Sequence, residues 1–227
     1  HDWLHCPNQN YAYTRWLEAF AQFTETAFVD TLAMEVFRPK TTPEVFATLH
    51  NGVLLLGLHV VSGSLQGIGQ QTSGDQELIM KDEKMKIFVR GTLDEYRGQF
   101  RAVVLLGNAR PSQQQYSFFT GIAPALRDSK TPVLYLHSDS NGAGTIEHYP
   151  FHFATPTTPV VSTTAVGRSG GTGTGNEEKE DKQQQKQDRD IQEYLQQILA
   201  VQVPNGGRGQ APVRITVGFG KQPFHIG

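Results

Sequence analysis

Apolar residues in this chain gather in short runs that are separated by longer stretches of mixed polarity. The short runs are of strand length and span residues 52–62, 102–106 and 132–136. The first is apolar on both faces, which is typical of a central strand. Stretches with apolar residues at helical spacing span residues 11–27, 75–99 and 113–128, where Gly91 and Pro124 are weak points. The alternation of strand and helix predicts a layered α/β or α+β domain.

The pattern changes in the second half of the chain. Residues 155–190 are rich in Thr, Gly and Ser and then in Glu, Lys and Gln, with no large apolar residue after Val166. Such a segment cannot bury enough surface to offset its ordering entropy, so we predict a flexible polar insertion, in which residues 177–190 could form a solvated helix. Residues 191–203 and 212–217 are apolar again, and we expect them to return to the same sheet. The chain is therefore expected to form one domain over residues 1–227.

Polar clusters directly follow the second and third apolar runs. Asn108 lies in the first cluster, and the second contains His137, Asp139 and Asn141. Polar side chains at the end of a buried strand build a site at a sheet edge, and His and Asp are metal-ligand types. Each cluster is also typical of a plain turn. His59, inside the first run, is expected to be a hydrogen-bonded core residue.

Composition narrows the function classes. The formal net charge is −2, which implies no basic face, so nucleic acid is not an expected partner. No apolar run approaches the roughly 20 residues of a membrane span. The single cysteine, Cys6, excludes a disulfide within this chain.

Several segments resemble the carboxyl-terminal half of calcineurin-like metallophosphoesterases. The run VVLLGNARPS, the run VLYLHSDSN and the closing ILAVQVPNGGRGQAPVRITV follow one another in the order of that family. The opening HDW followed by CPN resembles the end of a GNHD-type motif. The resemblance implies an αββα sandwich that is incomplete at its amino end, so we expect the chain to be a fragment.

The resemblance also implies a chemistry. The family hydrolyses phosphate esters with two metal ions that generate a bridging hydroxide. By position, His1 matches the histidine that protonates the leaving group or steadies the phosphate, and Asp2 matches its orienting acid. The positions that match metal ligands are Asn108, His137, Asp139 and Asn141.

This chain departs from the family pattern at those ligands. Asn108 and Asn141 stand where the family has histidine, Ser138 and Ser140 replace glycines, and no Asp-x-His motif occurs. An amide oxygen is a much weaker ligand for zinc, iron or manganese than an imidazole.

These departures predict a domain that has lost hydrolysis and serves as a scaffold or interaction subunit, with no bound cofactor. The alternative is an active phosphoesterase with two divalent ions (Mn, Fe, Zn or Mg), completed by an upstream segment. Protein partners in a larger assembly are a further expectation, through the insertion or the face over residues 11–28. The resembled branch is often exported, but the sequence leaves the compartment open.

Overall fold

The structure is a computed structural model that describes residues 8, 11–12, 14–19, 35–60, 73–111, 115–138, 147–151, 177–203, 214–218 and 223–226. Residues 11–12 and 14–19 are helical, in agreement with the helix predicted there. In chain order, the elements that follow are β1 (Val36–Phe37), β2 (Phe46–His50), β3 (Val53–Gly57), α3 (Ser73–Glu95), β4 (Ala102–Gly107), α4 (Tyr116–Asp128), β5 (Val133–His137), β6 (Glu147–Pro150), α5 (Glu177–Leu195), β7 (Leu199–Gln202), β8 (Ile215–Val217) and β9 (Phe224–Ile226).

A seven-stranded mixed sheet is the centre of the described structure. Its strand order is β1-β2-β3-β4-β5-β7-β6, and β3, β4, β5 and β7 run parallel. β1 and β2 extend it antiparallel at one side, and β6 is antiparallel to β7 at the other. The prediction of a mixed α/β fold is confirmed, and the strand predicted at residues 52–62 is central, as expected.

The hairpin of β2 and β3 depends on two residues of its turn. Asn51 and Gly52 both have positive φ angles, of 50° and 75°. An Asn-Gly pair with this backbone is typical of a type I′ turn, whose twist matches that of the two strands. Gly57, at the other end of β3, must be glycine because a Cβ there would overlap the ring of Phe46.

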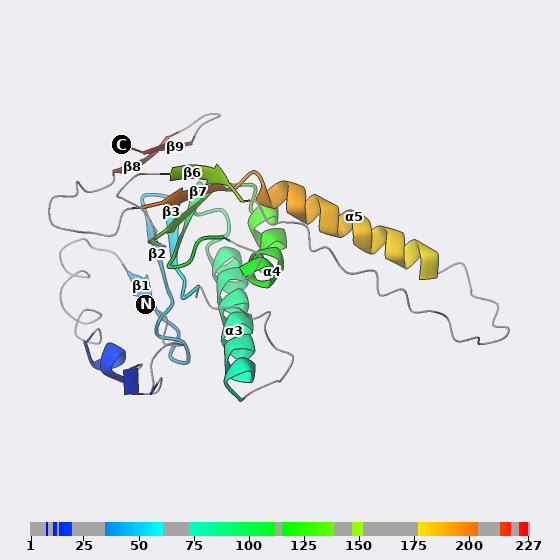
Figure 1. The fold of residues 1–227 in the computed structure, drawn as a ribbon. Coiled ribbons are helices and arrows are strands. Elements are labelled where there is room, and N and C mark those ends of the chain that lie inside the picture. Colours follow the sequence, from blue (N-terminus) through cyan, green and yellow to red (C-terminus); the bar gives the residue numbers. More distant parts are fainter. Residues whose placement is uncertain are drawn as a thin grey trace.

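The helices α3, α4 and α5 pack on one face of the sheet, where Figure 1 shows α3 and α4 side by side. Consecutive right-handed crossovers that move in one direction along a sheet place their helices on the same side. α4 continues through Pro124, which lacks only one backbone donor, and α3 continues through Gly91. Neither predicted weak point therefore ends its helix.

Two cores result from this arrangement. We call the larger one, between sheet and helices, the helix-side core; it contains Leu105 and Tyr135 from the strands and Phe119 from α4. The hairpin-side core lies on the opposite face, around Val104 and Leu134.

The β8–β9 hairpin covers part of that second face, with Ile215 and Phe224 against the hairpin-side core. β8 pairs with β9 in a separate two-stranded sheet, so the prediction that residues 212–217 return to the main sheet is wrong. The same prediction is confirmed for residues 191–203, because β7 lies between β5 and β6. The sequence of a short strand flanked by polar residues does not indicate which strand it pairs with. Here the apolar side chains of β8 pack on one face of the main sheet, and β8 does not pair with an edge strand of that sheet.

α5 includes residues 177–190 of the predicted insertion. The side chains described from Lys186 to Asp190 are exposed, whereas Leu195 is buried in the helix-side core. Residues 177–190 thus belong to a helix, as the sequence allowed, whose described side chains in this part are solvated and which is anchored by the apolar residues that follow. No helix of the described segments is both long and apolar enough to cross a membrane.

Candidate functional site

The carboxyl ends of the parallel strands form the candidate site, which we call the carboxyl edge. The residue register pairs Gly107 of β4 with His137 of β5, so the polar clusters that follow these strands are neighbours. Two backbone bonds continue the ladder past the strands: Leu58 N–H donates to the Leu106 carbonyl at 2.7 Å, and Val203 N–H donates to the His137 carbonyl at 2.8 Å. The described parts of the two clusters, residues 107–111 and 137–138, therefore lie at one sheet edge.

A direct contact joins the two clusters. The hydroxyl of Ser138 donates to Oδ1 of Asn108 at 3.2 Å. This amide oxygen is the atom that would have to replace an imidazole nitrogen if Asn108 held a metal ion. One of its two lone pairs is therefore already used by the protein.

A buried tyrosine positions the loop that carries Asn108. The hydroxyl of Tyr135 donates to the carbonyl of Ala109 at 2.7 Å, and both residues are at most 1% exposed. The tyrosine side chain crosses Gly107, where a Cβ would overlap its hydroxyl. Glycine at this position is thus required for the bond that holds the backbone after β4.

His137 belongs to the interior rather than to the edge surface. It is 1% exposed, and its ring stacks on Tyr135 with 5.7 Å between ring centroids and 22° between ring planes. Because side chains alternate along a strand, His137 and Tyr135 point to the same face, which is the face of the helix-side core. Ser138 follows His137 and alternates to the other face, where it meets Asn108.

His59 lies at the same edge and was expected to be a core residue. Its neighbours Leu58 and Val60 are buried in the helix-side core, so His59 alternates to the opposite face and is only half-buried. The strand-end position of His59 after β3 places it next to Asn108 by register, since Gly57 pairs with Leu106. The alternation with two buried apolar neighbours was the sequence signal that could have identified it.

The remaining sequence candidates cannot be placed. His1, Asp2, Asp139 and Asn141 lie outside the described residues. Within the described segments, no group of three or more His, Cys, Asp or Glu side chains could hold a metal ion. Three described side chains at the carboxyl edge carry atoms that could ligate a metal ion: Asn108, His59 and His137. The amide oxygen of Asn108 already accepts a hydrogen bond, and the two imidazoles lie on opposite faces of the sheet. This set does not suit a dinuclear centre by itself. What these side chains can do is exchange hydrogen bonds with a polar ligand.

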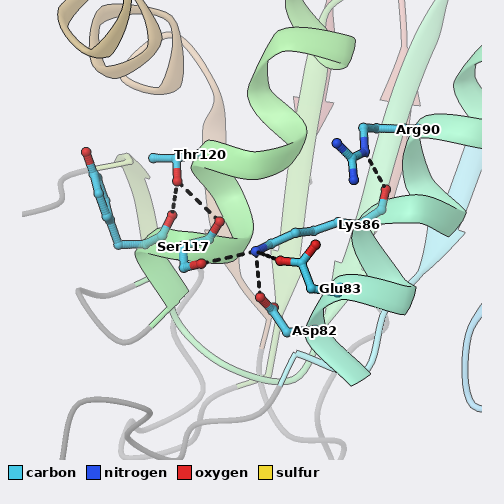
Figure 2. Close-up of polar contacts among 7 residues, drawn as sticks. Asp82, Glu83, Lys86, Arg90, Ser117 and Thr120 are labelled. Atoms are coloured by element: carbon cyan, nitrogen blue, oxygen red, sulfur yellow. Dashed lines mark hydrogen bonds and ion pairs between the residues drawn. The ribbon is translucent and has the colours of Figure 1, made fainter. Parts of the chain in front are cut away.

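A second polar cluster, which the sequence reading missed, joins α3 to α4 (Figure 2). Nζ of Lys86 lies 2.8 Å from Oδ2 of Asp82 and 2.8 Å from Oε1 of Glu83, and it donates to the hydroxyl of Ser117 at 3.1 Å. Lys86 is only 6% exposed, and its aliphatic stem runs over Gly121 of α4. Asp82 and Glu83 precede Lys86 by four and three residues, a spacing that predicts ion pairs on a helix. This spacing does not predict that Lys86 is buried.

The protonation states indicate a structural role for this cluster, in which Lys86 of α3 is bonded to Ser117 of α4. Burial alone would lower the pKa of Lys86, but the hydrogen bonds and charges of Asp82 and Glu83 outweigh it and raise the pKa. Burial raises the pKa of Asp82, against the opposing hydrogen bond from Lys86. A lysine that stays protonated cannot act as a general base toward Ser117, so the pair lacks the requirement of a serine–lysine nucleophile.

Comparison with known proteins gives no relative for this chain. No family model, no curated protein and no solved structure matches it.

Proposed function

We propose that the chain is a metallophosphoesterase-like domain whose metal motifs have degenerated, and that it serves as a scaffold or interaction subunit. The observation that carries the proposal is the hydrogen bond from Ser138 to Oδ1 of Asn108 at the carboxyl edge. It engages the atom on which metal binding at that position would depend, and it requires the serine that stands in place of a family glycine. An amide oxygen that already accepts a hydrogen bond has one lone pair fewer for a cation.

The coarse architecture is compatible with this proposal. Helices cover one face of the mixed sheet, and a separate two-stranded sheet packs on the other. In an αββα sandwich of the metallophosphoesterase type, the second face carries a full second sheet. We infer that β8 and β9 are part of such a sheet.

A second candidate function is an active phosphoesterase with an atypical metal set, completed by an upstream segment. His59 favours it, because this residue supplies an imidazole on the same face as Asn108. That imidazole would partly replace the missing family histidines.

A phosphoesterase assay separates the two candidates. The full-length protein is incubated with bis(p-nitrophenyl) phosphate and with Mn²⁺, Zn²⁺, Fe²⁺ or Mg²⁺ in turn, and metal content is measured after dialysis. The scaffold proposal expects no turnover above the metal-only background and no retained metal.

Turnover that is lost in Asp139→Ala would refute the scaffold and support the enzyme. Asp128→Ala is the matched control, because this exposed carboxylate ends α4 and precedes β5, at the opposite end of that strand. Equal loss of activity in both variants would indicate unfolding, and undiminished activity in both would indicate a contaminant, rather than turnover that depends on Asp139.

A further inference from the structure

The outer face of α3 exposes two large apolar side chains. Met80 is 55% exposed and Ile87 is 62% exposed, although both lie within a long helix of the packed layer. They are seven residues apart, so they lie on one stripe of the helix. A Cβ added at Gly91 would meet nothing within 4 Å, so the stripe is open for one further turn.

Charged residues border this stripe in a self-complementary order. Glu83 and Arg90 are both exposed and lie on the same side of the stripe, about 40° and 60° from Ile87 around the helix axis. Glu83 precedes Ile87 by four residues, and Arg90 follows it by three. The acidic border is therefore toward the amino end and the basic border toward the carboxyl end of α3.

We propose that this face of α3 binds the same face of a second copy of this chain, with the two helices antiparallel. A two-fold axis at Ile87 makes the contact isologous, which means that both copies use the same surface. Ile87 then packs on the partner's Ile87, and the open surface at Gly91 accommodates side chains of the partner's Lys84 region. This surface is independent of the carboxyl edge and of whether the domain hydrolyses phosphate esters.

The charges fix the antiparallel direction. At about 1.5 Å of rise per residue, Glu83 lies about 6 Å from the axis on one side and Arg90 about 4.5 Å on the other. Reversal of the second helix places the partner's Arg90 within about 1.5 Å of Glu83 along the axis, on the same border of the stripe. Two such pairs form in the dimer. A parallel two-fold arrangement would set Glu83 at the same height as the partner's Glu83 but on the opposite border of the stripe, far along the axis from the partner's Arg90, so the two Glu83–Arg90 pairs could not form.

The carboxylate of Glu83 and the guanidinium group of Arg90 both have atoms available for this pairing. Glu83 is 54% exposed even while one of its oxygens contacts Lys86. Arg90 donates from Nε to the Lys86 carbonyl at 3.3 Å, which leaves the end of its guanidinium group for another carboxylate. Figure 2 shows Arg90 extending from α3 near Lys86, away from Asp82 and Glu83.

The face is small, so we expect a weak dimer. One helix stripe with two large apolar side chains lies below the area of a standard stable interface, and a dissociation constant on the order of 100 µM is expected. Higher salt should weaken the dimer, because two exposed ion pairs set its register.

Sedimentation velocity over a concentration series tests the proposal with the full chain. Ile87→Lys places two positive charges together at the axis and should abolish the dimer. Arg90→Glu alone and Glu83→Arg alone should each weaken association at least about tenfold, and the double exchange should restore it to within about threefold. Lys130→Glu is the control, since this exposed residue follows α4 and should leave association unchanged.

Circular dichroism and the midpoint of thermal unfolding establish that each variant is folded. A chain that is monomeric at every concentration overturns the proposal. Association that survives Ile87→Lys, or that the double exchange fails to restore when all variants are folded, also overturns it, because the contact would then lie elsewhere or run in another direction.

Discussion

Replacement of Lys86 by methionine is the most informative perturbation of this fold. Methionine keeps most of the aliphatic stem over Gly121 but removes the ammonium group. The Asp82 carboxylate then lies between α3 and α4 without its cation. We expect a substantial loss of stability at neutral pH, even though the substitution makes the cluster more hydrophobic.

The size of the loss follows from the exposure of the partners. Loss of one partner from a fully buried ion pair costs about 3–5 kcal/mol. The Asp82 side chain is 15% exposed and can recover part of its hydration, so we expect about 2–3 kcal/mol for Lys86→Met. The Glu83 side chain is 54% exposed, and its pairing contributes at most about 0.5 kcal/mol.

Urea unfolding measures this difference. With a slope of about 2–3 kcal/mol per molar urea, the midpoint should fall by about 1 M in Lys86→Met and change little in the control Glu83→Gln. The double variant Asp82→Asn, Lys86→Met should recover to within about 1 kcal/mol of the natural chain, because the one carboxylate left without its cation, Glu83, is 54% exposed and hydrated. A Lys86→Met midpoint equal to that of Glu83→Gln would refute the reasoning.

The dependence on pH gives an independent check. The folded pKa of Lys86 is above 10.5, so its stabilising contribution is complete below pH 10.5 and is lost as the pH rises through the folded pKa. The folded pKa of Asp82 is above 3.8, so protonation of Asp82 favours the folded state, and this contribution is lost as the pH rises through its folded pKa. The penalty of Lys86→Met should therefore shrink at acid pH, where Asp82 is neutral, and at alkaline pH as the pH rises through the folded pKa of Lys86, where Lys86 loses its proton. A penalty that is constant with pH would mean that packing, not charge, joins the two helices.

Two further pairs of variants test the packing and the hydrogen bonds, each by urea unfolding. Gly91→Ala should stabilise the chain by about 0.5–1 kcal/mol through helix propensity. Gly121→Ala should not stabilise it, because the added Cβ would lie 2.9 Å from the aliphatic stem of Lys86. Equal effects of the two substitutions would contradict this packing. Tyr135→Phe should cost about 1–2 kcal/mol because the buried Ala109 carbonyl loses its donor. Tyr194→Phe should cost less than about 0.5 kcal/mol, since the buried Tyr194 hydroxyl has no hydrogen-bond partner among the described residues, and a larger loss would show that it has one. Burial raises the pKa of Tyr194, so this hydroxyl should also be absent from an ultraviolet titration of the folded chain near pH 10.

The elements that the sequence predicted well are those whose pattern is strong over many residues. The strand at residues 102–106 is continuously apolar and the helix at residues 113–128 has a regular apolar face, and both were found within three residues of the predicted bounds. The hairpin strand Phe46–His50 was missed, although Asn51-Gly52 is a strong hairpin signal, because its own alternation is short. The pairing of β8 with β9 could not have been predicted, since the choice of partner is decided by packing against the hairpin-side core.

The candidate site was predicted at the level of strand ends but not at the level of faces. Period-two alternation already places His137 on the same face as Tyr135. It also places Asn108 on the face opposite to that of Ala109, which is 1% exposed in the helix-side core. The burial of these neighbours decides which face each polar residue takes. The sequence alone could not supply that burial, because both faces of β4 and β5 are apolar.

The faces matter for the proposed function because a ligand at the carboxyl edge can approach only from outside the core. On the hairpin-side face it would meet Asn108, Ser138 and His59, whereas the ring of His137 lies against Tyr135 in the interior. A dinuclear centre that used both Asn108 and His137 would have to draw the imidazole away from a stacked, 1% exposed position. Such a movement would also disturb the tyrosine whose hydroxyl holds the Ala109 carbonyl, and hence the loop that carries Asn108. The packing that orders this edge thus works against the family's ligand set, which is the physical reason to expect a structural or binding role.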